Sequence, residues 1–253
     1  MIQVSIENNF ASWRTAARTL LQSEIAPGEI LWTDATTQNC LFENDFAPRS
    51  AGQSKEKILK VPADFLRIAE AVACFDDFCK WSLLYRLLFR LVYENRNLLA
   101  IESDDDVRRA FLMEKAVARD VHKFHAFVRF RRVEFEQKEF FAAWHEPHHF
   151  TVERAAPFFA RRFGTMLFSI FTPKGCAHWD LENLTFSEAV SSDSAPKTDE
   201  TEDFWLAYYK SIFNPFRLKI KAMKKELPVR HWRTLPEAAL IPELIRLARE
   251  KKS

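Results

Sequence analysis

The hydrophobic pattern of this 253-residue chain changes its period near Phe127, and this change constrains the fold more than any other feature. Before Phe127, apolar residues recur at the three- and four-residue spacing of helices. After it, they alternate with polar residues, as in strands. Helices and sheets that are each apolar on one side bury those sides in packed layers. The pattern therefore predicts an α+β fold with a helical N-terminal half, a central antiparallel sheet and a helical C-terminal cap.

The first half of the chain is predicted to be mainly helical. The segment 78–95 is apolar on most sides, which is typical of a buried central helix. Ser103 is a favourable N-cap before three aspartates, so another helix is expected from there to about His125. Further helices are expected at 10–21 and 62–75, and strands at 1–7, 29–33 and 39–42.

The second half is predicted to contain the main sheet. A polar, acidic stretch at about 191–203 is expected to be a surface loop, followed by helices to the end of the chain. A single α+β domain over residues 1–253 is expected. Its strands are predicted at 127–135, 140–146, 166–172, 176–180 and 184–187, with a helix containing 156–163 among them.

Charge is segregated along the chain, although its net value is only +2. Residues 205–253 carry twelve Lys/Arg against four Asp/Glu, and residues 108–132 carry eight against two. Such segregation suits a polyanionic partner, but solvated surface helices have the same composition. Only four glycines are present, which excludes a glycine-rich loop of the Walker or dinucleotide-binding type.

Several features favour a cytoplasmic protein with no membrane partner. The four cysteines form no CxxC pair and no regular framework, so reduced, mostly buried thiols are expected. The first ten residues lack the basic and apolar segments of a signal peptide. No apolar stretch approaches the roughly 18 residues that a membrane span needs.

Five of the seven histidines fall between residues 119 and 150. Imidazole is a ligand for zinc and iron, so a metal site is one interpretation; capping of turns and contact with phosphate are others. Pro147 prevents the HEPHH segment from being a helical HExxH site. The candidates for a metal are His145, His148 and His149, and those for catalysis are His122, His125 and Asp180.

Arginines interleaved with aromatic residues provide the second candidate site. In the VRFRR segment, Arg129 and Arg131 are predicted to share one strand face, with Val128 and Phe130 on the other. Guanidinium groups suit phosphate oxygens and aromatic rings suit bases, although a solvated sheet and a charged helix give the same pattern. The predicted nucleic-acid-binding residues are Arg129, Arg131, Arg161, Arg162, Lys219 and Arg230.

Motifs spread over the whole chain carry a family resemblance. They are SWRTAAR at 12–18, LLYRLLFRL at 83–91, DVHKFHAFVRFR at 120–131, EPHH at 146–149, FFARRF at 158–163, NPFRLK at 214–219, AM at 222–223 and ELPVRHWRTLPEA at 226–238. Together they resemble a domain family, of unknown molecular function, whose members are assigned to DNA metabolism or repair. His145 and His231 depart from its usual pattern, in which aromatic residues are expected, and this weakens a metal site centred on His145.

The resemblance implies a role beside other DNA enzymes. Family members are typically encoded next to a radical-SAM protein of DNA modification or repair, and some relatives are fused to a uracil-DNA glycosylase superfamily domain. This chain shows no glycosylase part, so it is not expected to excise a base itself. The resemblance therefore implies a DNA-binding accessory with DNA and a radical-SAM protein as partners.

Two alternatives remain open from the sequence. One is a metal-dependent nuclease or lyase acting on DNA, and the other is a non-catalytic adaptor that binds the radical-SAM protein. No cofactor is expected in this chain. A radical-SAM partner would carry an iron–sulfur cluster and S-adenosylmethionine.

Overall fold

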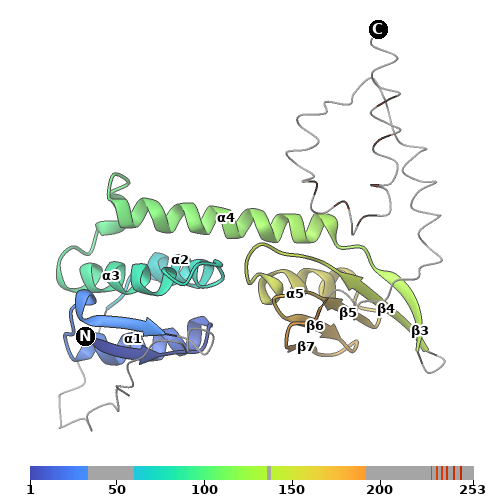
Figure 1. Cartoon of the computed structure of the whole chain (residues 1–253), viewed down its shortest axis with the longest axis horizontal. Helices are drawn as coiled ribbons and strands as arrows, with labels where there is room; N and C mark the ends of the chain where they lie inside the picture. Colours follow the sequence, from blue (N-terminus) through green and yellow to red (C-terminus); the bar gives the residue numbers. More distant parts are fainter. Residues whose placement is uncertain are drawn as a thin grey trace. The chain divides into compact units, whose positions relative to one another are not determined.

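The computed structural model describes residues 1–33, 60–135 and 138–191 (Figure 1). It also describes six single residues near the C-terminus: Val229, Trp232, Leu235, Ala238, Pro242 and Arg246. Contacts divide the chain into two compact units, Met1–Arg119 and Asp120–Ser253. The predicted strand at 39–42, the loop at about 191–203 beyond Ser191, and most of the C-terminal helices lie outside the described residues.

The first unit joins a small parallel sheet to helices. Strands β1 (Ile2–Ser5) and β2 (Ile30–Thr33) pair in parallel, and α1 (Phe10–Gln22) and the 3₁₀ turn η1 (Pro27–Glu29) lie between them in sequence. The Asn9 side chain caps α1 by accepting a hydrogen bond from the N–H of Ser12 at 2.8 Å. The remaining elements before the long fourth helix are α2 (Ala63–Ala73), α3 (Lys80–Tyr93) and the 3₁₀ turn η2 (Leu98–Ala100).

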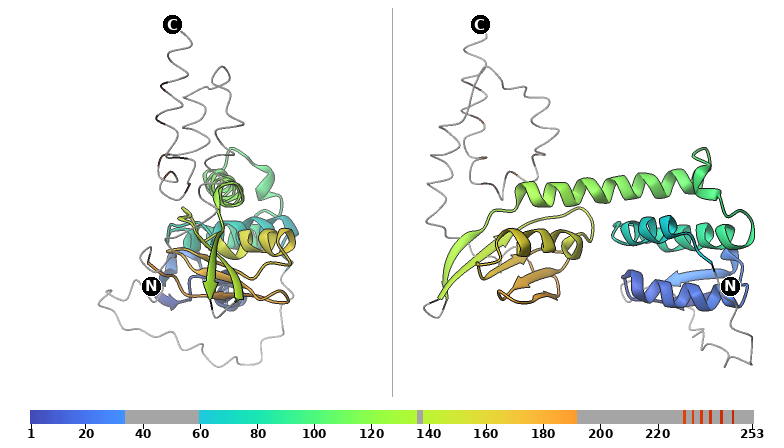
Figure 2. Two further views of the ribbon diagram at one scale, coloured as in Figure 1. Left: turned by 90° about the vertical axis from the view of Figure 1, so that its right-hand side faces the viewer. Right: turned by 180° about the vertical axis from the view of Figure 1, so that it is seen from behind.

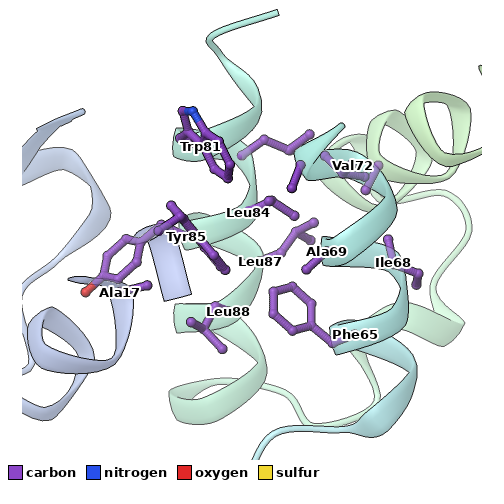
Figure 3. Close-up of a cluster of buried hydrophobic side chains, with 14 of the residues drawn as sticks. Ala17, Phe65, Ile68, Ala69, Val72, Trp81, Leu84, Tyr85, Leu87 and Leu88 are labelled. Atoms are coloured by element: carbon purple, nitrogen blue, oxygen red, sulfur yellow. The ribbon is translucent and has the colours of Figure 1, made fainter. Parts of the chain in front are cut away.

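Helix α3 is the centre of the first core, as its apolar sequence predicts. Leu84 and Leu87 are fully buried and face α2, which contributes Phe65 and Val72 (Figure 3). On α3, Trp81 stacks on Trp13 of α1 with ring centroids 6.1 Å apart. Burial of so many large apolar side chains supplies the main driving force for folding this unit.

Helix α4 (Asp105–Phe127) begins one residue later than the sequence predicts. Asp104, rather than Ser103, acts as its N-cap, because the Asp104 carboxylate accepts the N–H groups of Asp106 and Val107, both at 3.1 Å. Arg90 of α3 donates to the same carboxylate at 2.6 Å. This hydrogen bond, more than the backbone ones, holds the pKa of Asp104 below its usual value.

The second unit contains the predicted main sheet, and the α+β class is confirmed. Its strands follow the order β3-β4-β5-β6-β7. Their bounds are β3 (Arg131–Phe135), β4 (Lys138–Trp144), β5 (Phe168–Phe171), β6 (Cys176–Trp179) and β7 (Leu184–Ser187). Three neighbouring pairs are antiparallel, whereas β4 and β5 are parallel. The parallel pair is possible because α5 (Val152–Arg162) connects them, and a helix is the usual crossover between parallel strands.

Helix α5 packs along one face of this sheet (Figure 2). Phe159 of α5 and Phe168 of β5 are buried in the same core, together with Phe124 of α4. Near the C-terminus, Leu235 and Ala238 are buried against Phe127 and Trp232. Among the described helices, none is both long enough and apolar enough to pass through a membrane.

Candidate nucleic-acid interface

Helix α5 has two chemically distinct sides. Val152, Ala155, Ala156 and Phe159 are buried in the core. The opposite side is exposed and carries Arg154, Phe158, Arg161 and Arg162. These four residues follow spacings of three and four, so they form one continuous strip on the helix surface. We call this strip the α5 basic face.

The three guanidinium groups of the α5 basic face keep their charge available. Within residues 1–33, 60–135 and 138–191, Arg154, Arg161 and Arg162 form no hydrogen bond or ion pair with another side chain. Exposed arginines attract phosphate through both charge and forked N–H geometry. The α5 basic face is therefore a surface that can hold a polyanion.

His125 of α4 lies against this face. Its ring stacks on Phe158 with centroids 4.3 Å apart, and its Nε2 lies 3.1 Å from the carbonyl oxygen of Ala155. A carbonyl can only accept a hydrogen bond, so Nε2 carries the hydrogen. Burial lowers the pKa of His125, and the nearby His122 and Arg161 lower that pKa further when they are charged. His125 is thus a neutral aromatic ring at pH 7. It is half-buried, whereas the nearby His122 is exposed.

The arginines predicted on the VRFRR segment lie elsewhere. Helix α4 continues to Phe127 and β3 begins only at Arg131, so Arg129 precedes the strand. Arg129 donates to the carbonyl oxygens of Ala126 at 2.7 Å and Val128 at 3.2 Å. Its charge thus sits at the negative end of α4, where a cation stabilises the helix.

Arg131 lies on the other side of the sheet from α5. It pairs with Ala142, whereas the neighbouring Phe141 and Ala143 point into the core that α5 covers. The structure thus brings Arg161 and Arg162 together and separates them from Arg131. Lys219 and Arg230 lie outside the described residues.

A buried carboxylate holds the loop that leads into α5. Asp120 is only 3% exposed. Its oxygens accept the N–H groups of His148 at 3.1 Å and His149 at 3.0 Å, and the hydroxyl of Thr151 at 3.0 Å. The Lys174 ammonium group also donates to the carbonyl oxygen of His148. Because Thr151 immediately precedes α5, Asp120 fixes the position at which the helix begins.

The three candidate metal ligands have different surroundings. His145 is fully buried, with its ring 4.4 Å from that of Phe124. His148 is exposed and His149 is half-buried, and their ring centroids are 6.1 Å apart. In the described part of the chain, no three His, Cys, Asp or Glu side chains are grouped as a metal site would require.

The third catalytic candidate, Asp180, stabilises a turn. Its carboxylate accepts the N–H groups of Asn183 at 2.6 Å and Glu182 at 2.9 Å. Hydrogen bonds from the backbone of Asn183, and then of Glu182, lower the pKa of Asp180, so it is ionised near neutral pH. This arrangement is that of an Asx-type turn at the end of β6.

Sequence reasoning missed a polar row across the sheet. His178 of β6 lies between two hydroxyls: its Nδ1 is 2.7 Å from the oxygen of Ser169, and its Nε2 is 2.8 Å from that of Ser187. Burial lowers the pKa of His178, so the ring is neutral and one nitrogen donates while the other accepts. Such a row can pass a proton between the two hydroxyls. Strand register alone brings the three residues together.

Residues 79–237 match DUF4130, a domain of unknown function. The chain belongs to this family. The DUF4130 match covers more than half of the chain and runs from the start of α3 through the sheet, so it includes α5 and the basic face. No curated protein and no solved structure matches the chain.

Proposed function

We propose that this DUF4130 protein is a DNA-binding accessory of a radical-SAM enzyme of DNA modification or repair. The observation that carries the DNA-binding part is the α5 basic face, which exposes three arginines without a competing acidic partner in the described structure. The radical-SAM partner rests on the resemblance of the chain's motifs, and that partner would supply the iron–sulfur cluster and S-adenosylmethionine.

The chemistry of the α5 basic face favours contact with phosphates rather than reading of base sequence. Guanidinium groups that contact phosphates release the counterions condensed on DNA. If Arg154, Arg161 and Arg162 each contact one phosphate, the logarithm of the binding constant should fall with the logarithm of salt concentration. The expected slope is about −2.7 on duplex DNA and about −2.1 on a single strand.

The proposal is tested by fluorescence anisotropy of labelled DNA over a series of salt concentrations. The R161Q/R162Q variant should bind more weakly than the wild-type chain and show a shallower salt dependence, by roughly two phosphate contacts. The matched control is R14Q/R18Q, which removes the same charge from an exposed side of α1. If both variants weaken DNA binding equally, the effect reflects net charge alone. If neither the wild type nor the R14Q/R18Q control binds DNA, the proposal is overturned.

The same experiment bears on the two alternatives. Co-purification with the radical-SAM protein, without any DNA affinity at low salt, would favour the adaptor. The nuclease or lyase alternative predicts stoichiometric metal in the purified protein and cleavage that chelation abolishes.

A further inference from the structure

We propose that the α5 basic face prefers single-stranded DNA and that Phe158 stacks against an unpaired base. This inference rests on the proposed DNA binding and adds to it the form of the DNA. Within the α5 basic face, Phe158 is the only residue that is not an arginine, and 37% of it is exposed. It lies at the centre of the strip in sequence and in space.

The arginines flank the aromatic ring on the helix surface. Arg154 lies four residues before Phe158, and Arg161 and Arg162 lie three and four residues after it. Each spacing is about one helical turn, roughly 5 to 6 Å. A backbone that crosses the strip can therefore contact guanidinium groups on both sides while one of its bases meets the ring.

The aromatic ring is held in place from behind. His125 stacks on Phe158 with an interplanar angle of 27°, and its own contact with the Ala155 carbonyl fixes it to α5. Phe159 meets Phe158 edge to face with centroids 5.2 Å apart. The ring therefore loses little conformational freedom when it binds, which makes it a better stacking surface than a mobile side chain.

The second core is filled by Phe159 and does not require Phe158, which is exposed. Phe159 packs inside the second unit against Phe130 and Phe163, whereas Phe158 points to the exposed side. A single exposed aromatic residue is ordinary on a protein surface. An aromatic residue buttressed by a neutral histidine and flanked by three arginines that have no side-chain partner among the described residues instead has the composition of a single-strand binding surface.

Base stacking within the duplex decides between the two forms of DNA. In a duplex both faces of each base are covered by its neighbours, so stacking on Phe158 requires an unpaired or displaced base. A single strand offers that base without the cost of unstacking. The expected preference fits an accessory that holds DNA while another enzyme acts on an exposed base.

The test compares an oligodeoxythymidine of about 12 nucleotides, within the site sizes of single-strand binders, with the same oligonucleotide paired to oligodeoxyadenosine. Affinity for the single strand should exceed that for the duplex. Phe158→Leu should weaken single-strand binding on the order of tenfold and leave duplex binding unchanged, while Phe158→Tyr should retain the wild-type preference. The matched control is Phe186→Leu, which changes another exposed phenylalanine, 43% exposed, on β7.

The outcomes separate this inference from the proposed function. If R161Q/R162Q weakens binding but Phe158→Leu does not, the DNA surface remains and stacking on Phe158 is excluded. Equal affinity of the wild type for both forms of DNA would also overturn the inference. If the wild type binds neither form at low salt, the inference and the proposed function both fail.

Discussion

Asp120 accepts three hydrogen bonds from the segment 148–151 while it is almost completely buried. Asp120→Asn replaces one acceptor oxygen by an NH₂ group, which would face an N–H or O–H donor. We expect the free energy of unfolding to fall by about 1–3 kcal/mol, because a buried donor loses its acceptor. Urea unfolding followed by circular dichroism measures this. Asp105→Asn, at a highly exposed carboxylate, is the control and should change stability little. An equal effect of both substitutions would contradict the role of Asp120.

The contribution of the Asp104 charge to stability can be measured separately from the contribution of Asp104 as the N-cap of α4. Asparagine and aspartate cap helices about equally well, so Asp104→Asn removes chiefly the ion pair with Arg90. The pKa of Asp104 is lowered in the folded state, so its stabilisation is present above its unfolded value of 3.8 and is lost as pH falls through the folded pKa. We expect the wild type to be about 1 kcal/mol more stable than the variant at neutral pH and equally stable in strong acid. A difference that does not depend on pH would contradict this account.

At the scale of elements, the contact between α4 and α5 should depend on pH. The pKa of His125 in the folded protein lies below the ordinary histidine value of 6.5, mainly because the ring is partly buried. The unfolded chain therefore binds a proton first as pH falls, and the stabilisation is lost below about pH 6.5. Gln in place of His125 keeps a donor for Ala155 but does not titrate. The wild type should lose more stability than His125→Gln between pH 7 and about pH 5.5, as thermal unfolding can measure.

The sequence predicts these elements well where the signal is local. The apolar positions of 78–95 identify α3, and the change of period near Phe127 separates helix from sheet. The exact boundary is less predictable, because α4 continues to Phe127, Arg129 donates to the carbonyl oxygen of Ala126 at its end, and β3 begins only at Arg131. The alternation of apolar and polar residues, taken alone, predicts that Arg129 and Arg131 lie on the same face of one strand. Capping by a side chain of the following segment leaves no periodic signal.

The candidate site was predictable only in part. Arg161 and Arg162 stand out as an exposed basic pair in the sequence, and Arg154 could have been added from its spacing to Phe158. The hydrogen bonds of Asp120 join residues 28 to 31 positions apart, and the row around His178 depends on strand register. Neither arrangement follows from spacing along the chain, because both arise only when the sheet has formed.

At the scale of the whole molecule, the chain forms two compact units, and α4 contributes to both cores. Val107 and Met113 belong to the first core, and Phe124 belongs to the second. The sequence predicts that residues 1–253 behave as one domain. Leu84→Ala, in the first core, should then lower stability by about 2–5 kcal/mol and speed hydrogen exchange in β5 and β6 as well. Unchanged exchange in those strands would contradict a single cooperative domain.

DNA is proposed to contact the α5 basic face. Photo-cross-linking to a single strand that contains bromodeoxyuridine, followed by mass spectrometry of the peptides, tests it most directly. We expect cross-links within Val152–Arg162, centred on Phe158, that high salt abolishes. Cross-links confined to Met1–Arg119, or to the Arg131 side of the sheet, would contradict it.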